Sequence, residues 1–319
     1  MHPLLRALLS TWDWRWDILL VLAIFATLYT TGWWRLRKRS KQTKLANRAR
    51  LAAYWGGLIT LAVALMSPID PLGGQLFFMH MVQHLLTIMV AAPLLWLGAP
   101  FPFLLWGLPK RARTIATQQF RRNSPLRSIL VTLTQPAVSW LFFIAIYVGW
   151  HDPNFYDLAL VHPWVHDLEH ITFFASAMLL WWHVIGAGPH LHSAPIWGRI
   201  AMLIGIIPAN MGIGIIIATA DKVIYSYYAT VPHIWGFTAV EDQSLAGVIM
   251  WIPGSMMLIL AVLLLLSQAL RGTDENPPTP VADWDRDEAM VAPGLEHRVV
   301  QNKWRRLKTP SPLHPSDVS

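Results

Sequence analysis

The chain has 319 residues, of which 54% are hydrophobic and only 13% carry a charge. This composition is too apolar for an ordinary soluble domain and predicts an integral membrane protein. The net charge of +7 follows from membrane topology, so no nucleic-acid partner is expected. Because the chain contains no cysteine, disulfides, thiolate metal sites and cysteine nucleophiles are excluded.

Seven segments are apolar over the length of about 20 residues that a helix needs to cross a bilayer. The first follows "TWDWRWD" and shows no small-residue cleavage site, so we expect a retained helix rather than a signal peptide. The sequence predicts an all-α, seven-helix transmembrane domain over residues 1–271 and, from its polar, Pro-rich composition, a disordered tail over 272–319. The expected spans are 16–34, 48–66, 74–97, 128–150, 163–186, 198–220 and 243–268.

Lysine and arginine are distributed unequally between the two sides of these spans. Of the 25 Lys and Arg, 22 lie in the loops and tail of one side. Basic residues near helix ends resist translocation, so this side is expected to face the cytoplasm. The N-terminus is then outside and the C-terminal tail cytoplasmic, with membrane lipid surrounding the helices.

Several helix-disturbing residues fall inside the expected spans. Pro93, Pro136, Pro208 and Pro253 each lie within a different span, where proline removes a backbone donor and bends the axis. Asn210 has glycines close to it in "IIPANMGIGIII". Small residues permit close helix approach, so we interpret this stretch as a packing face.

Two histidine pairs lie at one level of the predicted bundle, toward the outer side. His80 and His84 stand four residues apart in "FFMHMVQHLL", and His166 and His170 do so in "HPWVHDLEH". Residues four apart share a helix face, so two pairs on two helices can surround one metal ion. Ionisable side chains in a membrane are costly and usually face the bundle interior. The sequence therefore predicts a metal site formed by these four histidines.

Other groups near this level extend the candidate ligand set. Asp242 opens the last expected span on the outer side, and Met250 lies two turns further along the same helix. Imidazole suits copper and zinc, while thioethers favour Cu(I). Asp167 and Glu169 are each rotated by about 100° from the histidine face. We therefore expect these two carboxylates behind the ligands or facing solvent.

The remaining histidines receive no ligand role. His151 and His162 lie at the same outer level, and His183 stands alone near the inner end of its span. A single histidine of this kind is more often hydrogen-bonded than metal-bound, so His183 is interpreted as structural. The others lie in expected loops or tails: His2, His190, His192, His233, His297 and His314.

Two further chemistries are compatible with paired histidines. One is an intramembrane zinc hydrolase, because H-x-x-x-H is the ligand half of a zinc-protease motif that also needs a general base. Met81 stands where the glutamate of that motif would be, and the second pair offers the shorter Asp167. The other is a haem-b protein, which would use one histidine from each of two helices.

Three stretches together give the chain a family resemblance. They are "HMVQHLL" with "APLLWLGAP", "HDPNFYDLALVHPWVHDLEHITFF" and "DQSLAGVIMWIPG", and the similarity runs from about Arg50 to Leu270. On these motifs the chain resembles the polytopic CtaG family of cytochrome c oxidase assembly factors.

This resemblance implies a non-enzymatic, multi-pass protein of the bacterial plasma membrane that is needed to form active haem-copper oxidase. It implies copper as the metal, delivered to the CuB centre, and oxidase subunit I or its assembly intermediates as the partner. The positions that carry over from the motifs are His80, His84, His166, His170 and Asp242.

Overall fold

The computed structural model describes residues 11–39, 45–119, 125–188, 192, 194–232 and 235–270. The regular elements of this part of the chain are all helices, as expected from the composition. The expected disordered tail, 272–319, lies outside the described residues.

Within the described ranges, six stretches of helix are long and apolar enough to cross a membrane. They are α2 (Trp16–Arg39), α3 (Arg48–Met66), the continuous run α5 (Phe77–Leu85), η1 (Leu86–Ala91) and α6 (Ala92–Leu97), then α12 (Pro163–Ile185), α13 (Ile196–Thr219) and α15 (Ala239–Leu270). Each overlaps one of the seven expected spans. The shorter elements are α4 (Ile69–Gly73), α7 (Pro100–Gly107), α8 (Lys110–Gln119), α9 (Pro125–Leu133), α10 (Pro136–Trp150), α11 (Pro153–Val161) and α14 (Tyr227–Thr230).

The expected span 128–150 is divided in the structure, which corrects the sequence prediction. Gln135 is extended, with ψ 138°, because the residue before a proline is disfavoured in the helical region. Pro136 consequently occupies the first turn of α10 instead of the interior of a longer helix. The resulting α10 has 15 residues, fewer than the roughly 20 that span a bilayer.

The helix that carries the first histidine pair changes register just before Pro93. The N–H of Ala92 bonds to the carbonyl of Thr87, five residues back, so η1 is a π-helix. In this register the carbonyl of Ile88 would need the N–H of residue 93, which proline lacks. The indole Nε1 of Trp181 on α12 donates to that carbonyl instead, at 2.8 Å. Because Pro93 has no N–H for this carbonyl, η1 is hydrogen-bonded to α12 at this point.

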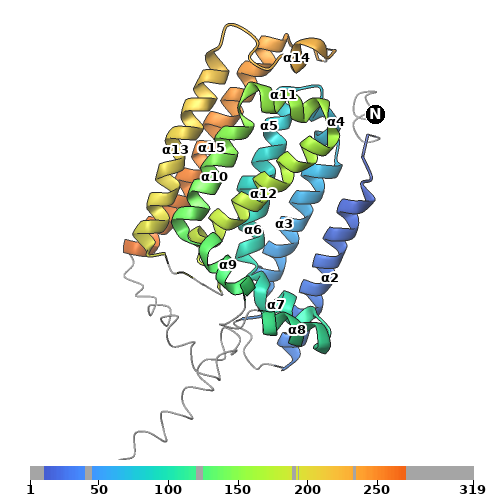
Figure 1. Cartoon of the computed structure of the whole chain (residues 1–319), viewed down its shortest axis with the longest axis vertical. Coiled ribbons are helices and arrows are strands. Elements are labelled where there is room, and N and C mark those ends of the chain that lie inside the picture. Colours follow the sequence, from blue (N-terminus) through green and yellow to red (C-terminus); the bar gives the residue numbers. More distant parts are fainter. Residues whose placement is uncertain are drawn as a thin grey trace, which may run out of the picture. The chain divides into compact units, whose positions relative to one another are not determined.

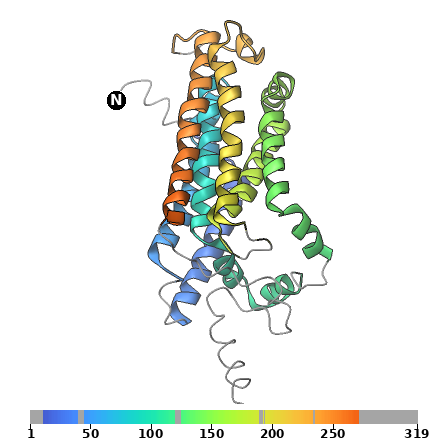
Figure 2. The same cartoon turned by 90° about the vertical axis from the view of Figure 1, so that its left-hand side faces the viewer.

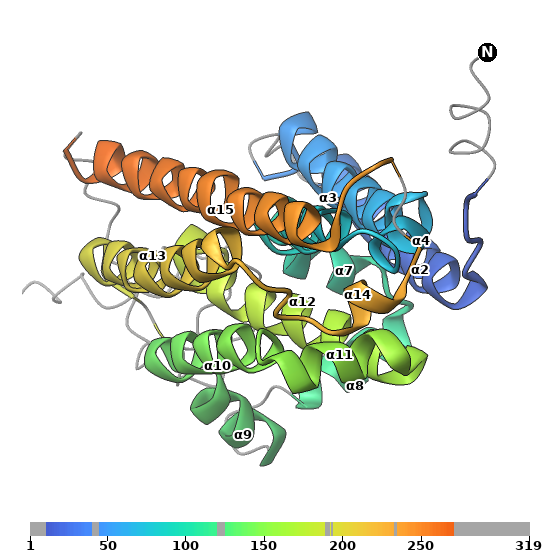
Figure 3. The ribbon, with the colours of Figure 1, turned by 90° about the horizontal axis from the view of Figure 1, so that it is seen from above.

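The helices form a bundle with short elements at both ends (Figure 1). The end at the top of the view holds α4, α11 and α14, and the other end holds α7, α8 and α9, while Figure 2 gives the orthogonal view. Seen from above, α13 runs along α15 (Figure 3). The α12 helix contacts η1 and α6 on one side and α10 on the other. This central position of α12 brings its histidines into the interior.

The orientation in the membrane can be tested at the two ends of this bundle, since the chain has no cysteine of its own. Asp221 is exposed beyond the end of α13, near α14, and Arg111 is exposed on α8. We expect a membrane-impermeant maleimide to label Asp221→Cys in intact cells and Arg111→Cys only after permeabilisation, because the basic side resists translocation. The reverse labelling pattern would overturn the orientation.

Candidate metal centre

The structure brings the two histidine pairs together between α5 and α12. The ring centroids of His80 and His84 lie 4.4 Å apart, and those of His166 and His170 lie 4.3 Å apart. Across the two helices, the His84 and His170 rings are separated by 5.2 Å. Single ring nitrogens of His80, His84 and His170 all lie within 4.8 Å of one another. Four imidazoles from two helices therefore face one small volume.

Glu169 completes this cluster, in contrast to the sequence interpretation that placed it behind the ligands or facing solvent. Its side chain is buried, with Oε1 3.3 Å from His84 Nε2 and Oε2 3.8 Å from His80 Nε2. The interpretation was wrong because Glu169 follows His166 by three residues, about 60° around the helix axis, so it shares the buried face of α12 with Val165, His170 and Phe173. The spacing H-x-x-E-H within "HDLEH", a known zinc-site pattern, contained the missed signal.

Asp167 lies apart from the cluster, near the start of α12. Its carboxylate accepts hydrogen bonds from the Arg15 guanidinium, which also contacts Asp17. The Asp167 side chain is 39% exposed, so the sequence interpretation of this residue agrees with its position. The hydrogen bonds to Asp167 and then Asp17 raise the pKa of Arg15 above its usual value. The pair fastens the segment before α2 to α12.

Asp70 on the short helix α4 is a further carboxylate at this level that sequence reasoning missed. A carboxylate oxygen of Asp70 and single ring nitrogens of His166 and His170 lie within 4.8 Å of one another. Burial raises the pKa of the Asp70 carboxyl, and a hydrogen bond from Gln83 Nε2 at 2.6 Å opposes that rise. No spacing in the sequence connects Asp70 to the histidines, because α4 is a short element between two spans.

Several buried polar atoms of the cluster have no hydrogen-bond partner among the described residues. Leaving such a donor or acceptor unpaired costs about 1–3 kcal/mol, more when it is charged. Six buried side-chain atoms lack a hydrogen-bond partner among the described residues: His80 Nε2, Gln83 Oε1, His84 Nε2, both oxygens of Glu169, and His170 Nε2. Five of the six belong to the histidines and Glu169. Nitrogen and carboxylate donors gathered in this way fit a transition-metal ion.

The same geometry does not fit a haem. A haem iron with two histidine ligands would hold them on opposite faces of a flat macrocycle. The rings that face each other across the two helices are already in contact, with centroid separations of 5.2 Å for His80 and His166 and 5.9 Å for His80 and His170. A macrocycle has no space between them.

Asp242 and Met250, both included in the expected ligand set, occupy two other places on α15. The Asp242 carboxylate accepts hydrogen bonds from the backbone N–H groups of Phe77 and Phe78 at 2.7 and 3.0 Å. It therefore satisfies the first N–H groups of α5, one turn before His80. Met250 is buried and lines a cavity of about 30 Å³ that also borders His84.

The histidines without an expected ligand role have ordinary surroundings where the structure describes them. His183 is buried, and its Nε2 lies 3.3 Å from Ser139 Oγ. His162 is exposed at the start of α12, and His151 Nδ1 lies 2.6 Å from the Tyr147 carbonyl. His192 Nε2 contacts the Val131 carbonyl at 2.7 Å. The following lie outside the described residues: His2, His190, His233, His297 and His314.

Comparison with known proteins gives this site a family context. Relatives include uncharacterized proteins of Mycobacterium bovis and Mycobacterium tuberculosis, each 27% identical over 264 residues. The aligned region covers 81% of this chain and 39% of each relative, so the chain spans well under half of their length. No solved structure matched the chain. The family Caa3_CtaG, described as cytochrome c oxidase caa3 assembly factor, matches residues 27–272. The chain belongs to this family of cytochrome c oxidase caa3 assembly factors.

Proposed function

We propose that the chain holds a copper ion at the outer level of the bacterial plasma membrane and delivers it to the CuB centre of a haem-copper oxidase. The observation that carries this proposal is a group of five buried atoms on His80, His84, Glu169 and His170 that have no hydrogen-bond partner among the described residues. The contacts among them are two histidine–Glu169 ion pairs, at 3.3 and 3.8 Å. One metal ion would give partners to atoms that otherwise make burial costly. Family membership supports the oxidase as client, with subunit I or an assembly intermediate as the partner.

The charge and chemistry of the centre favour Cu(I). Imidazole nitrogen suits copper, and the chain offers no thiolate as a competing donor. One carboxylate, Glu169, lies among the buried ring nitrogens. A monovalent ion beside one carboxylate and neutral imidazoles gives no net charge, which an apolar membrane interior tolerates best.

A cargo ion also needs a route to the buried ligands. Asp70 and His166 are partly exposed, whereas His80 and His170 are buried. Because Asp70, His166 and His170 can share one ion, an ion can be passed inward without losing all its ligands at once. The oxygen of Asp70 and the ring of His166 form the accessible side of the centre.

Replacing His84 or His170 by Ala tests whether the cluster binds copper. Each substitution removes one donor from a site of fixed geometry. We expect copper affinity to fall by more than about 100-fold, beyond the loss typical of residues that only orient a ligand. Oxidase activity should fall with it, while the amount of protein in the membrane is maintained, because an unpaired buried imidazole is itself costly.

The matched control is His162→Ala, which removes an exposed histidine from the start of the same helix. It should leave copper content and oxidase activity unchanged. Full copper content and normal oxidase activity in both cluster variants would contradict the proposal. Copper would be measured by elemental analysis of the detergent-purified chain.

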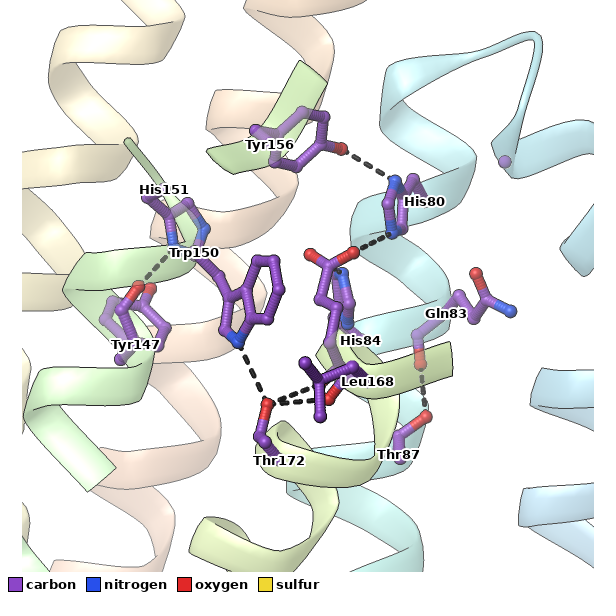
Figure 4. A network of polar contacts seen from close by, with 12 residues as sticks. His80, Gln83, His84, Thr87, Tyr147, Trp150, His151, Tyr156, Leu168 and Thr172 are labelled. Carbon is purple, nitrogen blue, oxygen red and sulfur yellow. Dashed lines mark hydrogen bonds and ion pairs between the residues drawn. The ribbon is translucent and has the colours of Figure 1, made fainter. Parts of the chain in front are cut away.

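Two tyrosine hydroxyl groups contact Nδ1 of His80, the ring nitrogen that faces away from the cluster. Tyr228 donates its hydroxyl proton to the Gly73 carbonyl at 2.8 Å, since a carbonyl can only accept. Tyr228 oxygen is then free to accept from Tyr156, at 3.5 Å. The Tyr156 oxygen lies 2.7 Å from His80 Nδ1 (Figure 4). In the tautomer that the proposed site requires, His80 Nδ1 donates to this oxygen and the lone pair of Nε2 faces the cluster.

Tyr156→Phe tests this positioning role. Without the hydroxyl, His80 loses the group that accepts from Nδ1, so the ring is no longer held in the metal-binding tautomer. We expect a fall in Cu(I) affinity of about 10–100-fold, measured by competition with a chromophoric chelator, with little change in the amount of folded protein. Tyr54→Phe, at a buried tyrosine of the separate cluster around Tyr29, is the control. Equal Cu(I) affinities of the Tyr156→Phe and Tyr54→Phe variants would show that Tyr156 does not position His80 for metal binding.

A zinc-dependent hydrolase is the second candidate function, and the position of Glu169 favours it more than the sequence alone did. The pair in α12 reads H-x-x-E-H, a pattern in which the glutamate serves as general base beside the metal. Both Glu169 oxygens lie close to ring nitrogens of the facing pair. The position of Glu169 suits either a metal ligand or a general base. Copper delivery requires the first role and zinc-dependent hydrolysis requires the second.

Glu169→Gln separates these two roles. If Glu169 is a ligand that balances the charge of copper, the neutral amide should weaken Cu(I) binding and lower oxidase assembly together. If Glu169 is a general base, the variant should retain its metal at full occupancy and lose only a hydrolytic activity. We expect the first result. Retention of the metal with normal oxidase assembly would contradict the ligand role.

A further inference from the structure

A small cavity lies beside the centre, deeper in the bundle. Its volume is about 30 Å³, and because about 10–15 Å³ holds one water-sized occupant, it accommodates an ion but no organic substrate. It is lined by two histidines, His84 and His151, and by three buried methionines, Met81, Met89 and Met250. His84 thus borders both the centre and the cavity. Figure 4 shows His151 and Tyr147 at the end of α10, across from His84 on α5.

The proton of His151 is also assigned by its surroundings. Its Nδ1 lies 2.6 Å from the Tyr147 carbonyl, which can only accept, so Nδ1 carries the proton. The Nε2 atom of the neutral ring keeps its lone pair and is a donor for a metal. This is the protonation state that a metal-ligating histidine requires.

The π-helix brings a thioether to the same side as His84. His84 and Met89 are five residues apart, which in a regular α-helix would separate them by about 140° around the axis. Because η1 closes its turns over five residues, the two side chains line one cavity. The π-helical register before Pro93 therefore places the thioether sulfur of Met89 in the cavity wall.

The opposite wall is held by a hydrogen-bond network around Asn210. Its Oδ1 accepts from the Tyr147 hydroxyl at 2.7 Å, and its Nδ2 donates to the Met250 carbonyl at 3.2 Å and to Ser255 Oγ at 2.9 Å. The amide joins α10, α13 and α15 at the level of the cavity. The sequence interpretation of Asn210 as part of a packing face is thus extended by a polar function: it positions Met250 and Tyr147.

We propose that this cavity is a second copper position, specific for Cu(I), which receives the ion from the histidine centre through His84. Thioether sulfur and imidazole nitrogen are the soft donors that Cu(I) prefers. None of the described lining residues is a carboxylate, so the cavity stabilises a monovalent ion better than a divalent one. The inference rests on the proposed copper function and assigns a transfer step to it.

The test uses the full-length chain purified in detergent and titrated with Cu(I) alone against a chromophoric chelator. We expect two ions per wild-type chain and a sulfur scatterer in the copper X-ray absorption spectrum. In the double variant Met89→Leu and Met250→Leu, the second ion should be lost and the sulfur signal should fall, since Met81 is then the one methionine left among the described lining residues. Leucine has a similar volume, so the packing is conserved. Met256→Leu, at a 64% exposed position of the same helix α15, should behave as wild type.

The outcomes separate this proposal from the function on which it rests. One ion per wild-type chain with nitrogen and oxygen scatterers alone would overturn the second position and leave the histidine centre intact. A double variant that retains both ions and an undiminished sulfur signal would also overturn it. No copper binding by the wild-type chain would overturn the proposed function as well. The wild-type spectrum decides the point even if the double variant fails to fold.

Discussion

The burial of one carboxylate and three imidazoles among apolar helices is the constraint on which the rest of this structure depends. Glu169, His80, His84 and His170 are each less than 10% exposed, and their facing atoms have no hydrogen-bond partner among the described residues. Such a group would be costly as a purely structural feature, because apolar residues of similar shape would serve better. The cation of the proposed function would offset this cost by giving the facing atoms a partner.

The surrounding helices keep these groups together through contacts made outside the cluster. Asp242 binds the first N–H groups of α5, Trp181 binds a carbonyl of η1, and Tyr156 binds the outward nitrogen of His80. Each contact fixes the direction of one ligand-bearing element without occupying a ligand atom. Asp242 therefore supports the position of the histidine pair through α5 without being part of the cluster.

The sequence predicted those features that depend on local spacing and failed where packing or a backbone break decides. Residues four apart must share a helix face, so both histidine pairs and the level at which they meet could be inferred. Glu169 was open to the same inference, because it follows His166 by three residues, whereas Asp70 enters from a short helix that no spacing connects to the histidines. The division at Pro136 also depended on backbone context: proline at that position can bend a helix or begin one, and only the extended Gln135 distinguishes the two.

The order of donors along the bundle suggests how selectivity and direction arise. α5 begins near α4 (Figure 1), and from that end the available donors change from oxygen and nitrogen at Asp70 and His166, through nitrogen and one carboxylate, to nitrogen and sulfur around Met89 and Met250. Hard divalent ions are favoured at the first step and disfavoured at the last, whereas Cu(I) shows the opposite trend. Under the proposed function, an ion that moves inward would be selected by softness at each step. Because the donors change gradually from Asp70 to Met250, the proposed transfer would require no single large loss of coordination.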